Sequence, residues 1–159
     1  MQGDPAIIAR LNEVLTNELT AVNQYFLHAR MLDNWGLRKL GKVIYDESID
    51  EMKHADKLIK RILFLDGLPN LQDLHKLAIG ENVLEALTAD LQLEVDGRAT
   101  LIAGVAQCEL AQDYISREIL EEILSDTEEH IDYLETQLKL MSSMGENNYI
   151  QTAAGEIEE

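Results

Sequence analysis

Apolar residues recur at intervals of three and four along most of this chain, the spacing that places side chains on one face of an α-helix. One such stripe runs from Ile7 to Phe26, and similar stripes follow it. Proline occurs only at positions 5 and 69, and no alternating run of apolar and polar residues is long enough to suggest a strand. The pattern therefore predicts an all-α protein.

Capping residues divide the pattern into four long helices and one short helix. Asp4 followed by Pro5 is typical of a helix start, and Gly67 can adopt the left-handed conformation that ends a helix. Asn82 and Glu85 have the spacing of a capping box. The expected helices cover residues 5–35, 39–66, 82–112, 114–143 and 147–154.

The connection between the second and third helices fixes the expected topology. A helix of that size is roughly 42 Å long, and the stretch 67–81, when extended, spans roughly 50 Å. This connection can therefore run the length of the bundle, whereas the other links are short. We expect a single domain over residues 1–159, a four-helix bundle with one long crossover plus a short C-terminal helix.

Glu51 and His54 are three residues apart, so both side chains can point from one helix into the bundle. Taken alone this pair is weak evidence, because acidic helices often carry such a pair on a solvated face. A carboxylate with an imidazole suits iron or manganese, and zinc less distinctively.

A repeat of 76 positions strengthens the interpretation as a metal site. Glu18 maps onto Glu94 and His54 onto His130, but Glu51 maps onto Thr127. The four positions 18, 51, 94 and 127 fall near the middles of their helices and should meet at one level. The sequence thus predicts a two-metal site in which the second half lacks a carboxylate.

Charge and cysteine content restrict the function further. The chain has 13 basic and 30 acidic side chains, a net charge of −17, which argues against nucleic acid or an anionic membrane as a partner. It shows neither a long apolar run nor a signal-peptide pattern, so we expect a cytoplasmic protein. Cys108 is the single cysteine, which excludes an internal disulfide and suggests a small buried thiol.

Several long segments of the sequence resemble the bacterioferritins. They are Met1 to Asp4, Asn23 to Arg30, Glu47 to Asp56, Gly67 to Leu71 and Gly145 to Tyr149. The resemblance implies that the expected bundle is a ferritin-like domain. It also implies a hollow shell of 24 subunits that oxidises ferrous iron at a di-iron centre in each bundle and stores the ferric mineral inside. In this family the di-iron ligands match Glu18, Glu51, His54, Glu94 and His130, whereas Thr127 stands where the family has a bridging glutamate.

Thr127 changes the expected chemistry. Three carboxylates would face the four positive charges of two ferrous ions, and a threonine hydroxyl neither carries a charge nor bridges two metals. Glu128 lies on another face, and Asp126 is displaced by roughly 100° around the helix. Asp126 and its repeat counterpart Asp50 are better suited to orienting the histidines. We expect incomplete iron binding and slow ferroxidase activity.

Met52 lies roughly 100° around the helix from Glu51 and should point towards a neighbouring molecule. The resemblance matches it to the methionine that ligates haem b, one from each of two symmetry-related subunits. Leu19, Val22, Phe26, Ile49 and Lys53 would line that shared pocket. A neutral thioether ligand favours ferrous haem, so electron transfer is the expected role.

Three functions remain open at this point. The chain is either a haem-binding subunit of mixed shells beside a complete second subunit, a competent homopolymeric ferroxidase that uses water or Asp126 as a ligand, or a shell and electron-entry protein without oxidation chemistry. In the family a bacterioferritin-associated ferredoxin delivers electrons to the haem, and the matching docking residues are Leu68, Glu81 and Glu85.

The remaining candidates are weaker. Tyr25 lies on the same face as Glu18 and matches a tyrosine near the family's di-iron centre, with a redox role or ordinary packing as alternatives. His28 and His75 lack carboxylates at metal spacing, and both are expected to be solvated. Asp46, Glu47 and Asp50 either face the cavity and attract ferrous iron or form an ordinary charged helix face.

Overall fold

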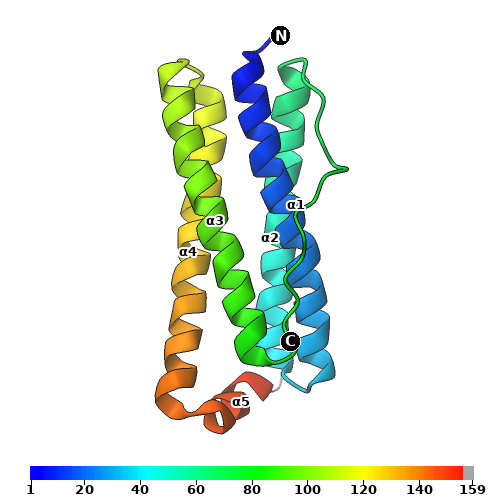
Figure 1. Cartoon of the computed structure of the whole chain (residues 1–159), viewed down its shortest axis with the longest axis vertical. Coiled ribbons are helices and arrows are strands. Elements are labelled where there is room, and N and C mark those ends of the chain that lie inside the picture. Colours follow the sequence, from blue (N-terminus) through cyan, green and yellow to red (C-terminus); the bar gives the residue numbers. More distant parts are fainter. Residues whose placement is uncertain (156–159) are drawn as a thin grey trace.

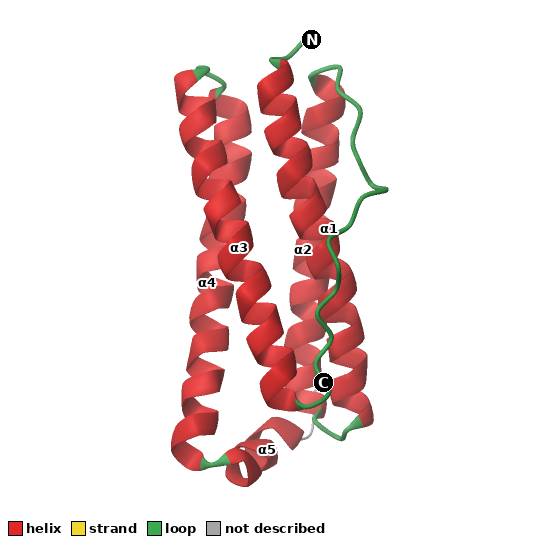
Figure 2. Cartoon of the chain, in the orientation of Figure 1, coloured by secondary structure: helices red, strands yellow, loops and turns green. Residues whose placement is uncertain are grey.

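Four long helices pack side by side, and a short fifth helix crosses one end of the bundle (Figure 1). The computed structural model describes residues 1–155, and it contains no strand within that range (Figure 2). The helices are α1 (Pro5–Asn34), α2 (Arg38–Phe64), α3 (Val83–Leu110), α4 (Tyr114–Met144) and α5 (Glu146–Ala154). The all-α prediction and the four-helix bundle with a short terminal helix are confirmed.

The helix ends follow the capping residues, with one exception. The Asp4 carboxylate accepts a hydrogen bond from the backbone N–H of Ala6, and the Asn82 side chain accepts one from the N–H of Glu85. After α2, however, Asp66 rather than Gly67 adopts the left-handed conformation, with φ of 60°. Gly67 is needed for space instead, since a Cβ there would lie 2.7 Å from a methyl group of Ile8.

The segment 65–82 runs along α1 from one end of the bundle to the other, so α2 and α3 are parallel (Figure 1). Side chains of α1 hold it along its whole length. Asn12 bonds to the backbone of Leu68 and Asn70, and the Thr20 hydroxyl accepts the N–H of His75. The connection is therefore a fixed part of the bundle, as the predicted crossover requires.

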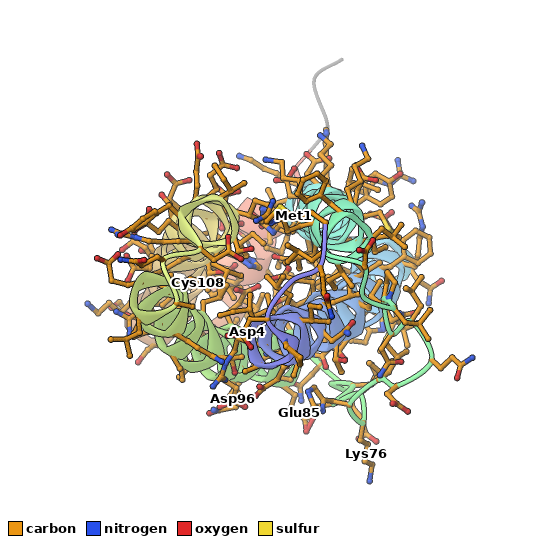
Figure 3. All side chains as sticks on the ribbon, turned by 90° about the horizontal axis from the view of Figure 1, so that it is seen from above. Met1, Asp4, Lys76, Glu85, Asp96 and Cys108 are labelled. Carbon is orange, nitrogen blue, oxygen red and sulfur yellow. The ribbon has the colours of Figure 1, made fainter. Side chains whose placement is uncertain are left out.

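The core consists of two apolar clusters, one towards each end of the bundle. The first includes Leu15, Leu58 and Ile123, together with the buried Cys108, which is labelled in the view from above (Figure 3). The second includes Tyr25 and Leu134. Between them the four helices contribute buried polar side chains instead. No helix within residues 1–155 is both long and apolar enough to cross a membrane.

Candidate metal centre

Carboxylates and histidines from all four long helices form the polar layer between the two apolar clusters. Glu18, Glu51, Glu94 and Thr127 line one small cavity. Each of these four side chains is at most 5% exposed. The structure therefore brings together the four positions that the 76-residue repeat placed at one level, and threonine occupies the fourth as a buried residue.

The first half of the centre is built around His54. Its Nδ1 lies 3.4 Å from a carboxylate oxygen of Glu18 and 3.5 Å from one of Glu51. Its other nitrogen, Nε2, lies 2.7 Å from a carboxylate oxygen of Asp126 on α4. Asp126 thus fixes the ring so that Nδ1 faces the two glutamates, the orienting role expected for it.

The second half is built around His130 and is less complete. The Nδ1 atom of His130 lies 3.0 Å from Glu94 and 3.6 Å from Glu47. Its Nε2 atom is buried without a hydrogen-bond partner among the described residues. Asp50, the repeat counterpart of Asp126, does not reach this ring and lies 3.9 Å from the Lys53 ammonium instead. The orienting role expected for Asp50 is therefore wrong.

Burial and charge make the centre suited to cations. Burial raises the pKa of Glu18 to about 7, and repulsion from Glu94 and Asp126 adds to the rise while His54 opposes it. For His54 burial acts to lower the pKa, but hydrogen bonds and attraction to Glu18 and Asp126 outweigh it and raise the pKa to about 9. Protons on Glu18 and His54 therefore reduce the repulsion between the buried carboxylates, and a metal ion would neutralise more of this charge.

The donor set fits divalent metal ions. Glu18, Glu51 and His54 offer ligand atoms that all lie within 4.8 Å of one another, and so do Glu47, Glu51 and His130. Glu51 belongs to both groups. Within residues 1–155 no lysine or arginine forms an ion pair with Glu18, Glu51 or Glu94. Buried carboxylates without such a partner require either protons or a metal ion.

Tyr25 lies against the second half of the centre. Its hydroxyl donates a hydrogen bond of 2.5 Å to Glu94, and its ring meets the His130 ring edge-on with centroids 5.3 Å apart. Burial, together with Glu94 and Asp90, raises the pKa of Tyr25 well above its usual value. The phenol is therefore a fixed proton donor that orients Glu94.

His28 corrects one expectation, since it is fully buried rather than solvated. Its Nδ1 lies 2.7 Å from Asp90, and its Nε2 accepts the N–H of Gly80 from the crossover. Asp90 also accepts a bond from Gln24. Sequence reasoning missed Asp90, although it lies one helical turn before Glu94. His75 is exposed, as predicted.

The residues expected around haem lie on the outer face of α1 and α2. Met52, Phe26 and Ile49 are 49%, 45% and 37% exposed, which is unusual for such apolar side chains. Ser48 bonds to the carbonyl of Val22, which sets the register of the two helices at this level. Lys53 and the partly buried Val22 lie on the same outer face as Met52, Phe26 and Ile49. Leu19 departs from the expectation, because it is only 9% exposed and packs in the core.

Two further acidic candidates on α2, Asp46 and Glu47, point in different directions. Asp46 is exposed and pairs with Lys42, whereas Glu47 turns inward towards His130. Of the residues matched to ferredoxin docking, Leu68 lies at one end of the crossover, and Glu81 and Glu85 lie at the other. A single docking surface that used all three would therefore combine different subunits.

Comparison with known proteins agrees with this architecture. Residues 8–144 match the model of the ferritin-like domain. The chain is 50% identical over 159 residues to a bacterioferritin of Brucella melitensis, covering 100% of this chain and 99% of that protein. It is 52% identical over 149 residues to a bacterioferritin of Mycobacterium tuberculosis, covering 94% of each. It is 49% identical over 152 residues to one of Streptomyces coelicolor, covering 96% and 91%. The chain belongs to the ferritin-like family, and within it to the bacterioferritins.

Proposed function

We propose that this chain is a cytoplasmic iron-storage subunit that takes up ferrous iron at the buried centre, oxidises it slowly, and carries haem between pairs of subunits. The supporting observation is the layer of Glu18, Glu51, His54, Glu94 and His130 between two apolar clusters, with Thr127 buried at the sixth position. Such a layer destabilises a bundle unless it binds a cation.

The proposed ligands would bind the two ferrous ions with unequal strength. Glu18 and His54 bind the first ferrous ion, with Asp126 holding the imidazole in place. Glu51 lies within reach of both halves and would contribute a carboxylate to each. Glu94 and His130 bind the second ion, and no charge comes from Thr127. The second ion is therefore bound more weakly, which slows any oxidation that needs both.

Anaerobic titration with ferrous iron tests this function. The wild-type assembly should show two binding steps of unequal affinity, followed by slow oxidation when oxygen is mixed in. Thr127→Glu should raise the oxidation rate by about 10-fold or more, since an added carboxylate ligand stabilises the second ion by about 1.4 kcal/mol or more. Thr127→Gln, which has the shape without the charge, is the matched control.

Two results would favour the other functions. Rapid oxidation of two ferrous ions per wild-type subunit, with no gain from Thr127→Glu, would support a competent homopolymeric ferroxidase. No ferrous binding at all would support a shell and electron-entry subunit. A complete second subunit in mixed shells agrees with the slow-oxidation proposal, because it would supply the oxidation that this chain lacks.

Haem binding rests on the exposed face around Met52. The Met52 thioether is a soft, neutral donor that would hold the haem iron, and the apolar side chains of Phe26 and Ile49 would exclude water around it once two subunits meet. Haem held there supplies a one-electron redox centre, with electrons delivered by a bacterioferritin-associated ferredoxin that docks at Leu68, Glu81 and Glu85. Titration should saturate at one haem per two subunits. Met52→Leu should abolish this binding, and Met31→Leu should preserve it.

A further inference from the structure

Glu47 occupies an unusual position between the solvent and the metal centre. It lies one helical turn before Glu51 on α2, so both carboxylates lie on the same face. Its oxygen is 3.6 Å from Nδ1 of His130, although its side chain remains 26% exposed. The next acidic residue outward, Asp46, pairs with Lys42 on the surface. Glu47 therefore differs from an ordinary residue of a charged helix face, because its carboxylate lies beside the buried centre.

The surroundings of Glu47 lack the partners that an acidic side chain normally has. Within residues 1–155 it forms no ion pair with a lysine or arginine, and its close cationic neighbour is His130. The same His130 is 3% exposed and leaves Nε2 unpartnered. The ring nitrogen that faces Glu47 is Nδ1, which Glu94 also approaches, so a cation at this point would meet the imidazole and both carboxylates.

We propose that Glu47 is a carboxylate ligand of the second metal ion in this chain and substitutes for the glutamate that Thr127 replaces. Ligand atoms of Glu47, Glu51 and His130 already lie within 4.8 Å of one another. With Glu47 the centre has four carboxylates, which match the charge of two divalent ions. The missing charge therefore comes from a neighbouring helix and not from a residue near position 127.

Glu47 also connects the centre to the surface. It lines a pocket of about 420 Å³ between α2 and α4, together with Asp50, Asp126 and Glu129. Lys53 and Lys57 line the same pocket but pair with Asp50 and Glu122 respectively. A carboxylate that is partly exposed at this pocket and lies 3.6 Å from His130 is accessible to a divalent ion from the solvent. A partly exposed ligand holds metal less tightly than a buried one.

The inference rests on the proposed metal centre, and cobalt binding can test the two separately. We expect calorimetric titration of the assembled wild-type protein with Co²⁺ to show two sites per subunit. Glu47→Gln should weaken the second site by about 10-fold or more and leave the first unchanged. Asp46→Asn, one position away, should leave both sites unchanged. Diffraction data collected at the cobalt edge from wild-type crystals should show anomalous density for an ion beside the Glu47 carboxylate.

A double-mutant cycle separates a ligand from a residue that only supports the structure. In a Thr127→Glu background, Glu47→Gln should change the second-site affinity by less than about 3-fold, because the restored glutamate takes over. An equal loss of second-site affinity in both backgrounds would overturn the proposal that Glu47 takes the place of the missing glutamate. Two intact sites in Glu47→Gln would overturn it too, while leaving the proposed function standing. If Co²⁺ binds nowhere in the wild type, both proposals fail.

Discussion

At the scale of single residues, the proposed centre would couple metal binding to protons through His54. With its pKa raised to about 9, the ring is about nine-tenths protonated at pH 8 in the metal-free protein. Since only the neutral imidazole binds metal, each ion that enters the first half should release close to one proton. Apparent affinity should rise with pH and level off above about pH 9, which calorimetry in two buffers of different ionisation enthalpy can measure.

Asp126 provides the control for this effect. Its carboxylate helps to raise the pKa of His54, so Asp126→Asn should lower that pKa by about one unit. Proton release at pH 8 would then fall to about half a proton per ion. Asp50→Asn, whose carboxylate contacts no histidine, should release the same number of protons as the wild type. Identical release by the Asp126 variant would disprove the coupling.

Sequence spacing predicted where the candidate metal ligands lie but not which side chains turn towards one another. The 76-residue repeat placed Glu18, His54, Glu94 and His130 at one level because a long helix keeps a constant rise per residue. It did not predict the inward turn of Glu47. Helical spacing places Glu47 on the same face as Glu51, but the approach of its carboxylate to His130 on α4 depends on side-chain torsions, which spacing does not determine.

At the scale of elements, a buried polar network fastens the end of the crossover near Gly80 to the bundle. The Gly80 N–H donates to Nε2 of His28, so that nitrogen carries no proton. The proton must therefore be on Nδ1, which donates to Asp90. Gln24 donates to the same carboxylate and accepts the N–H of Ala78. The network thus fixes a neutral His28 and satisfies two backbone groups of the crossover.

Removal of His28 should release this end of the crossover. His28→Ala leaves Asp90 and the Gly80 N–H without their buried partner, which should cost about 2–4 kcal/mol. We expect faster amide hydrogen exchange at Ala78 and Gly80 and a lower unfolding temperature. His75→Ala, at an exposed position of the same segment, should change stability by less than about 0.5 kcal/mol. Equal exchange in the two variants would contradict this role.

The crossover also explains why sequence reasoning was wrong about His28. On α1 alone, His28 lies where an amphipathic helix could face solvent, and no acidic residue has a suitable spacing on that helix. Its partners come from α3 and from the segment that covers it. Local patterns predicted the helices and the length of the crossover well, because both depend on neighbouring residues. They could not predict which surface the crossover buries.

At the scale of the whole molecule, charge and exposed apolar area act in opposite directions on assembly. A net charge of −17 makes copies of the chain repel one another. The face formed by Phe26, Ile49 and Met52 instead favours association, because it removes apolar area from water. A pair of subunits joined there would bring two Met52 side chains together, as the haem proposal requires.

Phe26→Asp should therefore prevent pairing while the bundle still folds. Arg30, whose guanidinium lies over the Phe26 ring at 5.1 Å, can accompany the carboxylate in the free subunit. In a pair, burying this charge should weaken association by about 100-fold, equivalent to about 3 kcal/mol. Sedimentation velocity should show smaller species without haem, and Co²⁺ should still bind at Glu18 and His54. Phe26→Leu, which keeps the face apolar, should assemble and bind haem normally, whereas haem-loaded assemblies of Phe26→Asp would disprove that two subunits meet at this face.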